Sequence, residues 1–254
     1  GLPIVERALA TGGWKKLDRI YREAMPQSTE QVMFPSKFSG PGCDPPVEIP
    51  DMATPTALSG WAHVWSSTFG ALQLKHLVQT HGAWWWQGDA LAGNWGGDRF
   101  SLWRGPSGIA LVWRTVWDDE ATARKFARTW REQLSVRYAD MTPLGDGRRW
   151  LVRPELPKPS GDKVRVSNAE HVVVQRRGRR VVVIEGVPPG HSASIAAQTW
   201  AALPPEAATQ ISGRCPATEL LAREQPTELP TPRLRDRLFL PHRTVFFSVY
   251  SGWT

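Results

Sequence analysis

The chain of 254 residues is basic, with 31 lysines and arginines against 24 acidic residues and a formal net charge of +7. Its 41% hydrophobic content is enough for a sizeable buried core and excludes a chain that is disordered throughout. No apolar run approaches the length needed to cross a bilayer, although peripheral attachment to a membrane stays open.

The beginning of the chain is expected to be helical. Apolar residues recur at helical spacing over residues 2–24, and Gly12-Gly13 interrupts them, which predicts two helices with a break. Ser28 is followed three residues later by Gln31, a capping-box pattern that indicates a short helix.

A loop and two further helices complete the expected helical N-terminal part, residues 1–98. The loop is predicted over residues 39–56, which are rich in proline and glycine. The helices are predicted over residues 68–82 and 83–93, and Gly93 is a suitable end for the second.

Three consecutive tryptophans, Trp84, Trp85 and Trp86, fall in the second of these helices. Successive side chains of a helix point about 100° apart, so the three cannot all face one core. We expect at least one to be exposed, packed under the C-terminal tail or buried in a partner, and we favour core and intermolecular packing over the stacking of a sugar or another ligand.

The stretch that follows, "NWGGDR", is expected to join helix to sheet. Trp95 with Gly96 and Gly97 predicts a tight turn. Asp98 and Arg99 are expected to hydrogen-bond to neighbouring backbone and to have a structural rather than a catalytic role.

Residues 99–203 are expected to form the sheet part of the same domain. Strands are predicted over residues 99–105 and 108–117, around residue 150, and on both sides of Gly178. A helix capped by Asp118 and a second through Ile195 and Trp200 alternate with these strands. The predicted fold class is α+β, with N-terminal helices, a mainly antiparallel sheet, helices on one face and an extended tail.

The densest basic cluster surrounds Gly178 and comprises Arg176, Arg177, Arg179 and Arg180. It lies between two β-branched runs, which predicts the tip of a hairpin. A solvated tip is favoured over a phosphate-binding one, since proteins that bind nucleic acid spread their cations along a face. Nucleic-acid binding is therefore the third of our functional hypotheses.

Residues 204–254 are expected to be an extended, proline-rich tail. The tail ends in an apolar run that contains Phe246, Phe247 and Tyr250. Because proline suppresses regular structure, we expect this run to need another surface, either the Trp84–Trp86 region or another subunit. Residues 244–250 are also available to add a strand to a sheet edge.

The two cysteines, Cys43 and Cys215, both lie in loop-like sequence rich in proline and glycine. One long-range disulfide in an oxidising compartment and two unrelated buried thiols both fit this pattern, and we predict the disulfide.

Several motifs carry a family resemblance. "GGWKKLDRIYREAMPQSTEQVMFPSKF", "PVEIPD", "NWGGDRFSLWRG" and "TVWDDEATARKF" together resemble a group of exported bacterial proteins related to HExxH zinc metallopeptidases. The resemblance covers roughly residues 10–130 and, more loosely, the chain up to 203. It implies export to the periplasm, the cell surface or the medium. In those relatives the HExxH helix lies upstream of the segment that matches residues 1–21.

The chain itself carries no HExxH pair, and its closest histidines, His76 and His81, are five residues apart. Two histidines one helical turn apart are needed to share a metal, so we expect no catalytic, cofactor-binding or metal-binding residues here. Our first hypothesis is a pseudoenzyme, an exported interaction or structural protein that associates with a protein partner or with its own copies in a larger assembly. The alternative is the C-terminal portion of an active zinc peptidase whose HExxH segment lies elsewhere.

Overall fold

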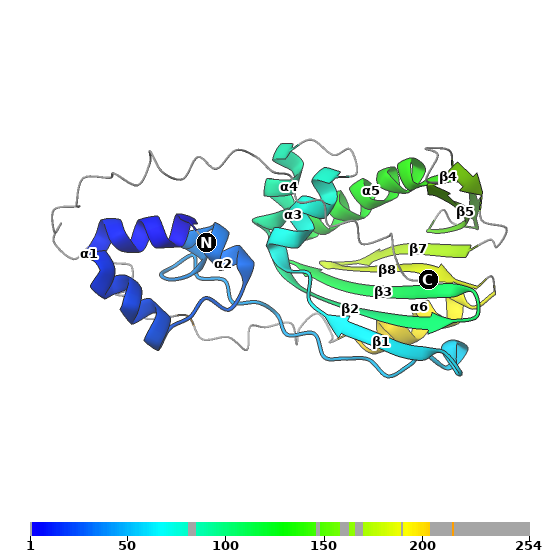
Figure 1. The fold of residues 1–254 in the computed structure, drawn as a ribbon, viewed down its shortest axis with the longest axis horizontal. Helices are drawn as coiled ribbons and strands as arrows, with labels where there is room; N and C mark the ends of the chain where they lie inside the picture. The colour runs from blue at the N-terminus through cyan, green and yellow to red at the C-terminus, as the bar shows by residue number, and fades with distance from the viewer. Residues whose placement is uncertain are drawn as a thin grey trace.

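A computed structural model provides the structure of the protein, and the residues that it describes are 2–80, 85–145, 148–157, 163–165, 170–188, 190–203 and 215. The predicted fold class is confirmed, because helices at the N-terminus precede an antiparallel sheet on which further helices pack (Figure 1). The tail, including Phe246, Phe247 and Tyr250, lies outside the described residues except for Cys215. No helix in the described ranges is both long and apolar enough to cross a membrane.

The N-terminal helices form a small part with its own core. Helix α1 (Leu2–Glu23) consists of two helical stretches joined at Gly12 and Gly13, which confirms the predicted break. Gly13 has a φ of 64°, a conformation that favours glycine. The buried apolar residues of this part are Ile4, Ala8, Leu17, Ile20 and Phe38.

Helix α2 (Thr29–Met33) begins as its sequence predicts. The hydroxyl of Ser28 accepts a hydrogen bond from the backbone N–H of Gln31 at 3.2 Å. The side chain of Gln31 accepts from the backbone N–H of Gln27 at 2.8 Å, one residue before the position that a regular capping box uses.

The expected loop is confirmed between two short 3-10 helices, η1 (Pro35–Lys37) and η2 (Thr56–Leu58). Helices α3 (Gly70–Thr80) and α4 (Trp85–Ala92) also form where they were predicted. The strand β1 (Ala62–Ser67) was not anticipated, because its residues are mostly exposed and show no alternation of polar and apolar side chains.

The sheet follows the order β1-β2-β3-β8-β7-β5-β4, with every neighbouring pair antiparallel, and β6 pairs with β5. Strand β4 joins one edge of the sheet directly after the long helix α5. The elements of this part are β2 (Trp95–Gly105), β3 (Gly108–Trp117), α5 (Glu120–Arg137), β4 (Tyr138–Leu144), β5 (Arg149–Pro157), β6 (Lys163–Arg165), β7 (Glu170–Arg177), β8 (Arg180–Val187) and α6 (Ser192–Ala201).

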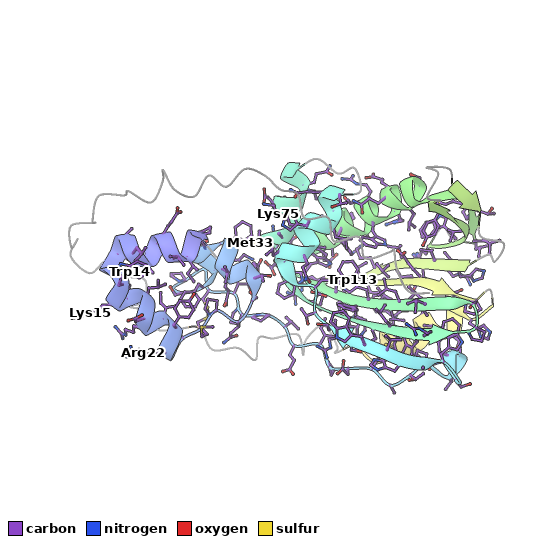
Figure 2. All side chains as sticks on the ribbon, viewed as in Figure 1. Trp14, Lys15, Arg22, Met33, Lys75 and Trp113 are labelled. Atoms are coloured by element: carbon purple, nitrogen blue, oxygen red, sulfur yellow. A yellow bond between two sulfur atoms is a disulfide. The ribbon has the colours of Figure 1, made fainter. Side chains whose placement is uncertain are left out.

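The sheet has a hydrophobic core on each face. On one face, α3, α4 and α5 cover a core that includes Trp113, Trp117 and Phe126 (Figure 1). Trp113, labelled in Figure 2, is completely buried there. The helix α6 lies on the opposite face, where Ile195 and other residues pack together with part of the loop before β1. The prediction of helices on one face of the sheet therefore holds for α3, α4 and α5, while α6 covers the other face.

Candidate functional site

The motifs that carry the family resemblance gather where the N-terminal helices meet the sheet. The "WGGDR" stretch is part of strand β2, so the expected tight turn at Trp95 is wrong. The pairing of β2 with β3 shifts register between Trp95 and Gly97, which is a β-bulge rather than a turn. The backbone N–H of Trp95 donates to the carboxylate of Glu30 in α2 at 3.2 Å.

Another segment crosses β2 at very short range, at Gly96 and Gly97. The backbone N–H of Val47 donates to the carbonyl of Gly96 at 2.7 Å. A Cβ atom at Gly97 would lie 2.5 Å from the carbonyl oxygen of Val47, closer than side chains approach backbone. We call residues 46–51, the "PVEIPD" motif, the strap, and the missing side chain of Gly97 lets it lie against the strand.

Asp98 connects the sheet to the first turn of α3. Its side chain is buried and accepts four N–H groups, namely the backbone N–H of Phe69 (2.9 Å) and Gly70 (2.8 Å) and the indole N–H of Trp95 (2.9 Å) and Trp113 (2.9 Å). Burial raises the pKa of Asp98 above its ordinary value, and the four donors oppose that rise. Because every acceptor position is used within the fold, the carboxylate is committed to fixing the helix on the sheet.

Arg99 binds the strap instead of neighbouring backbone. Its guanidinium donates two hydrogen bonds to the carboxylate of Asp51, at 2.8 and 2.9 Å. These contacts lower the pKa of Asp51. A hollow of about 750 Å³ opens beside this pair between the strap and β2, and its walls include Thr68 and Gln27.

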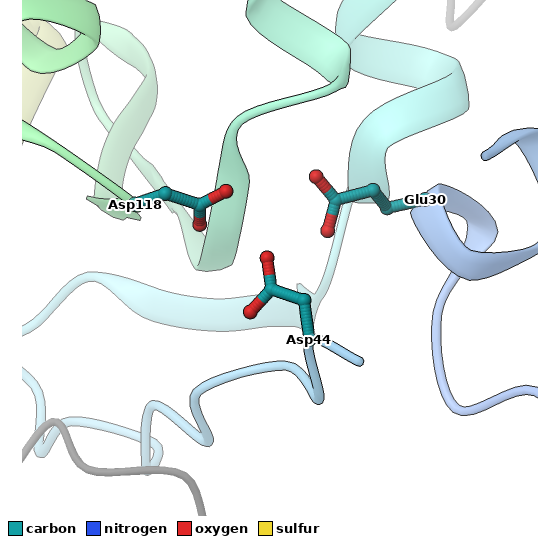
Figure 3. Close-up of side chains that lie close together, drawn as sticks. All are labelled: Glu30, Asp44 and Asp118. Carbon is teal, nitrogen blue, oxygen red and sulfur yellow. The ribbon is translucent and has the colours of Figure 1, made fainter. Parts of the chain in front are cut away.

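Three carboxyl groups from separate segments converge at the same junction. Glu30 comes from α2, Asp44 from the loop that precedes the strap, and Asp118 directly follows the last residue of β3 (Figure 3). The ammonium group of Lys37 lies between them, 2.8 Å from Glu30, 2.6 Å from Asp44 and 2.5 Å from Asp118. This group ties the N-terminal helices to the sheet, and we call it the Lys37 cluster.

Three negative charges around one ammonium leave an excess of negative charge, which favours the retention of a proton. Burial raises the pKa of Glu30 to about 8, against the opposing effect of Lys37. Burial likewise raises the pKa of Asp118 to about 6. At neutral pH, Glu30 is therefore expected to hold a proton while Lys37 neutralises a neighbouring carboxylate.

The Lys37 cluster has the chemistry of a cation site. Its three carboxylate oxygens lie within 4.8 Å of one another, and an all-oxygen set suits Ca²⁺ or Mg²⁺ better than zinc. The ammonium group already provides the positive charge in this space. Among the described residues this is the only group of three or more metal-capable side chains, and it contains no histidine.

Sequence reasoning missed most of this cluster. Asp118 was expected to cap α5, but the cap is Asp119, whose carboxylate accepts from the backbone N–H of Thr122 at 2.7 Å. That leaves Asp118 free to reach Lys37, 81 positions away in the chain. Glu30 lies in the "STEQ" stretch of the resembling motifs, but no local signal singled out Glu30, Lys37 or Asp44.

The tryptophans of α4 give less information than those of β2 and β3. Trp84 lies outside the described residues, and for Trp85 and Trp86 the structure gives only the helical backbone. The exposed surface predicted for this run therefore stays a prediction. Large apolar side chains are exposed elsewhere, at Trp14 on α1 (Figure 2) and at Trp65 on β1.

Cys43 and Cys215 form a disulfide, with their Cα atoms 5.9 Å apart. The bond fixes residue 215 to the loop that follows η1. A structural disulfide is typical of an oxidising compartment.

The arginines of the hairpin between β7 and β8 are largely engaged within the fold. The guanidinium of Arg177 lies over the ring of Trp200 at 4.5 Å, and that of Arg176 lies 3.4 Å from the carboxylate of Glu120. Contacts of this kind fix the hairpin against α5 and α6 and leave fewer cations to meet a phosphate backbone.

Comparison with known proteins gives one match. The model of a family described as a domain of unknown function (DUF8575) matches residues 62–195, just over half of the chain. The match runs from β1 into α6, so it includes Asp98, Arg99 and Asp118 but not Glu30 or Lys37. No curated protein and no solved structure matches the chain.

Proposed function

The chain belongs to this family, and we propose that it is a non-catalytic, exported interaction protein that assembles with further copies of itself. The contact is the outer edge of strand β1, which receives residues 244–250 of a second copy as an added strand. The scaffold is one that it shares with HExxH metallopeptidases, a relation that rests on the sequence motifs alone.

The observation that carries the proposal is the exposed edge of β1. Within the described residues β1 pairs only with β2, so its other edge has no strand beside it. The side chains of Val64 and Trp65 are 47% and 57% exposed there. Edge strands with exposed apolar side chains pair readily with another chain, and proteins usually protect them with charges or coverings.

The occupant that fits this edge best is the apolar run at the end of the tail. Residues 244–250, "TVFFSVY", are rich in β-branched and aromatic residues, which strands favour. The disulfide holds residue 215 to the N-terminal part, and 28 residues separate Cys215 from Thr244. At about 3.3 Å for each residue, this linker spans about 90 Å, which is long enough to reach a neighbouring copy.

The polar groups at the junction support a non-catalytic role. The carboxylate of Asp98 is saturated by four donors, and the Lys37 cluster contains its own counter-charge. A carboxylate that acts as a general base or a metal ligand needs a lone pair that is not already occupied by hydrogen bonds within the protein. Export is supported by the disulfide, since such bonds persist in oxidising compartments.

Self-association is tested by light scattering after size exclusion over a hundredfold range of protein concentration. We expect the full chain to form dimers or larger species, and both Val64→Lys and deletion of residues 240–254 to give monomers with an unchanged melting temperature. The matched control is Trp14→Lys, which removes a tryptophan that is 65% exposed on α1 and should leave assembly intact.

Two results would overturn the proposal. The first is a full chain that is monomeric at every concentration, and the second is a Val64→Lys variant that assembles as the full chain does. Elemental analysis and a peptide-hydrolysis assay distinguish the proposal from the zinc-peptidase alternative. One bound zinc per chain together with hydrolysis would favour the enzyme.

A further inference from the structure

Arg114, in the middle of strand β3, is a buried cation that has no hydrogen-bond partner in the described part of the chain. Its side chain is completely buried, with 0% exposed. Among the described residues, none of its three guanidinium nitrogens has a hydrogen-bond partner. Burial lowers the pKa of Arg114 to about 10, so the group still carries its charge at neutral pH.

A buried, unpaired guanidinium is costly, because it has lost its water and gained no acceptor in return. Part of its surroundings is apolar. The cross-strand neighbour of Arg114 on β8 is Val182, and Ile49 of the strap belongs to the same core. Buried cations in proteins are normally paired with an anion, so the position implies a missing acceptor.

Arg99 stands beside Arg114 on the same face of the sheet. The two residues are directly opposite one another in the antiparallel pair β2–β3, which places their side chains on one face. Two like charges in this position destabilise a sheet unless an anion lies between them. Among the described residues, the anion next to this pair is the carboxylate of Asp51, whose side chain is 61% exposed. It hydrogen-bonds to Arg99 alone, and its charge opposes the fall in the pKa of Arg114.

The geometry also provides a route to this pair. The hollow between the strap and β2 reaches Arg99 and Asp51, and its volume of about 750 Å³ is in the range of small-molecule sites. Asp51 and Arg99, which hold one another, both line the hollow, and Arg114 lies directly across the strand pair from Arg99. Glu48, the other acidic residue of the strap, lines the same hollow and is exposed.

We propose that Arg99 and Arg114 form a binding site for a small oxyanion, an organic carboxylate or a phosphate, beneath the strap. Asp51 is the internal competitor for this site, since it presents a carboxylate to Arg99 in the bidentate geometry that a ligand would use. The ligand displaces Asp51 and is bound by both guanidinium groups. The site is independent of the β1 edge and of self-association.

The test uses the full chain and follows its melting temperature during titration with citrate or phosphate, against sodium chloride at equal ionic strength. Arg114→Met keeps the volume and removes the charge. It should raise the melting temperature without ligand and abolish the response to the oxyanion. Asp51→Asn removes the competitor and should lower the Kd by about tenfold. The matched control is Arg104→Met, an exposed arginine of the same strand β2, which should respond as the parent chain does.

Each outcome decides the proposal. A response to either oxyanion that Arg114→Met abolishes supports it, and the two titrations distinguish a carboxylate ligand from a phosphate ligand. An equal response in Arg114→Met identifies general salt effects and overturns it, as does the lack of any response in both the parent chain and Asp51→Asn. The variant Arg114→Lys keeps the positive charge but lacks the planar guanidinium. Calorimetric titration of this variant should show binding that is weakened but measurable.

Discussion

Replacing Lys37 with methionine removes the ammonium group that neutralises the carboxylates of its cluster. At pH 8 we expect the free energy of unfolding to fall by about 3 kcal/mol. Removing one partner of a buried ion pair costs about 3–5 kcal/mol, because the remaining charge stays buried. The lower value applies here, since the side chains of Asp44 and Asp118 are 25% and 23% exposed and keep part of their water.

The loss should depend on pH, and its direction follows from the raised pKa of Glu30. The pKa of Glu30 is about 8 in the folded protein and 4.5 in the unfolded chain. The folded state therefore binds the proton more tightly, and the stability that this provides is full below pH 4.5 and is lost as the pH rises through 8. Without Lys37 the carboxyl groups hold their protons more tightly still, so Lys37→Met should be nearly harmless at pH 5.

The measurement is urea unfolding at pH 5 and pH 8, followed by tryptophan fluorescence. The matched control is Lys75→Met, because Lys75 makes one ion pair of 2.6 Å with Asp89 at a more exposed site (Figure 2). That variant should lose less than about 1 kcal/mol at either pH. Ca²⁺ should stabilise Lys37→Met and not the parent chain, since the three oxygens then lack a cation.

The reasoning would be refuted by a Lys37→Met variant that loses the same free energy at both pH values, or no more than Lys75→Met loses. A second variant, Glu30→Gln, checks the origin of the pH dependence. It keeps the acceptor for Lys37 and removes the titrating proton. Its stability should therefore change less between pH 5 and pH 8 than that of the parent chain.

Three further changes test the other parts of the junction. Asp98→Asn leaves two of four buried donors unsatisfied and should cost about 2–6 kcal/mol in urea unfolding, and a loss below 1 kcal/mol would contradict the role assigned to that carboxylate. Gly97→Ala places a Cβ atom 2.5 Å from the carbonyl of Val47 and should cost about 1–3 kcal/mol and expose the strap to proteolysis, whereas unchanged cleavage would mean that the strap does not rest on this glycine. Reduction of the bond between Cys43 and Cys215 should lower stability by about 2–4 kcal/mol, and free thiols found by alkylation before reduction would contradict the bond itself.

Local patterns in the sequence were sufficient for most of the helices and several strands. The break at Gly12-Gly13, the cap at Ser28 and the hairpin around Gly178 depend on neighbours a few residues away, and each was predicted correctly. The strand β1 escaped prediction because it is short and exposed, and its place in the sheet depends on pairing with β2. The strand propensity of a residue is a poor guide for an exposed edge strand, because it reflects packing against neighbouring strands and burial.

Prediction from the local sequence fails at the junction between the N-terminal helices and the sheet. Asp118 and Asp119 are both suitable helix caps in sequence, and only the folded chain shows that one caps α5 while the other meets Lys37. The two glycines of "WGGDR" suggested a turn, but both lie in β2, and Gly97 is needed because the strap crosses it. A glycine required by a distant segment has the same sequence signal as a glycine required by its own φ.

The sequence by itself determined the elements that arise from short-range periodicity and capping, together with the fold class and the basic, tryptophan-rich character of the chain. The tertiary structure alone decided which charges meet. Lys37, Arg99 and Arg114 look alike in sequence, yet the first is surrounded by carboxylates, the second has one, and the third has none among the described residues. The physical reason is that electrostatic and hydrogen-bonding energies depend on distance and burial in space, and both are set by contacts between segments far apart along the chain.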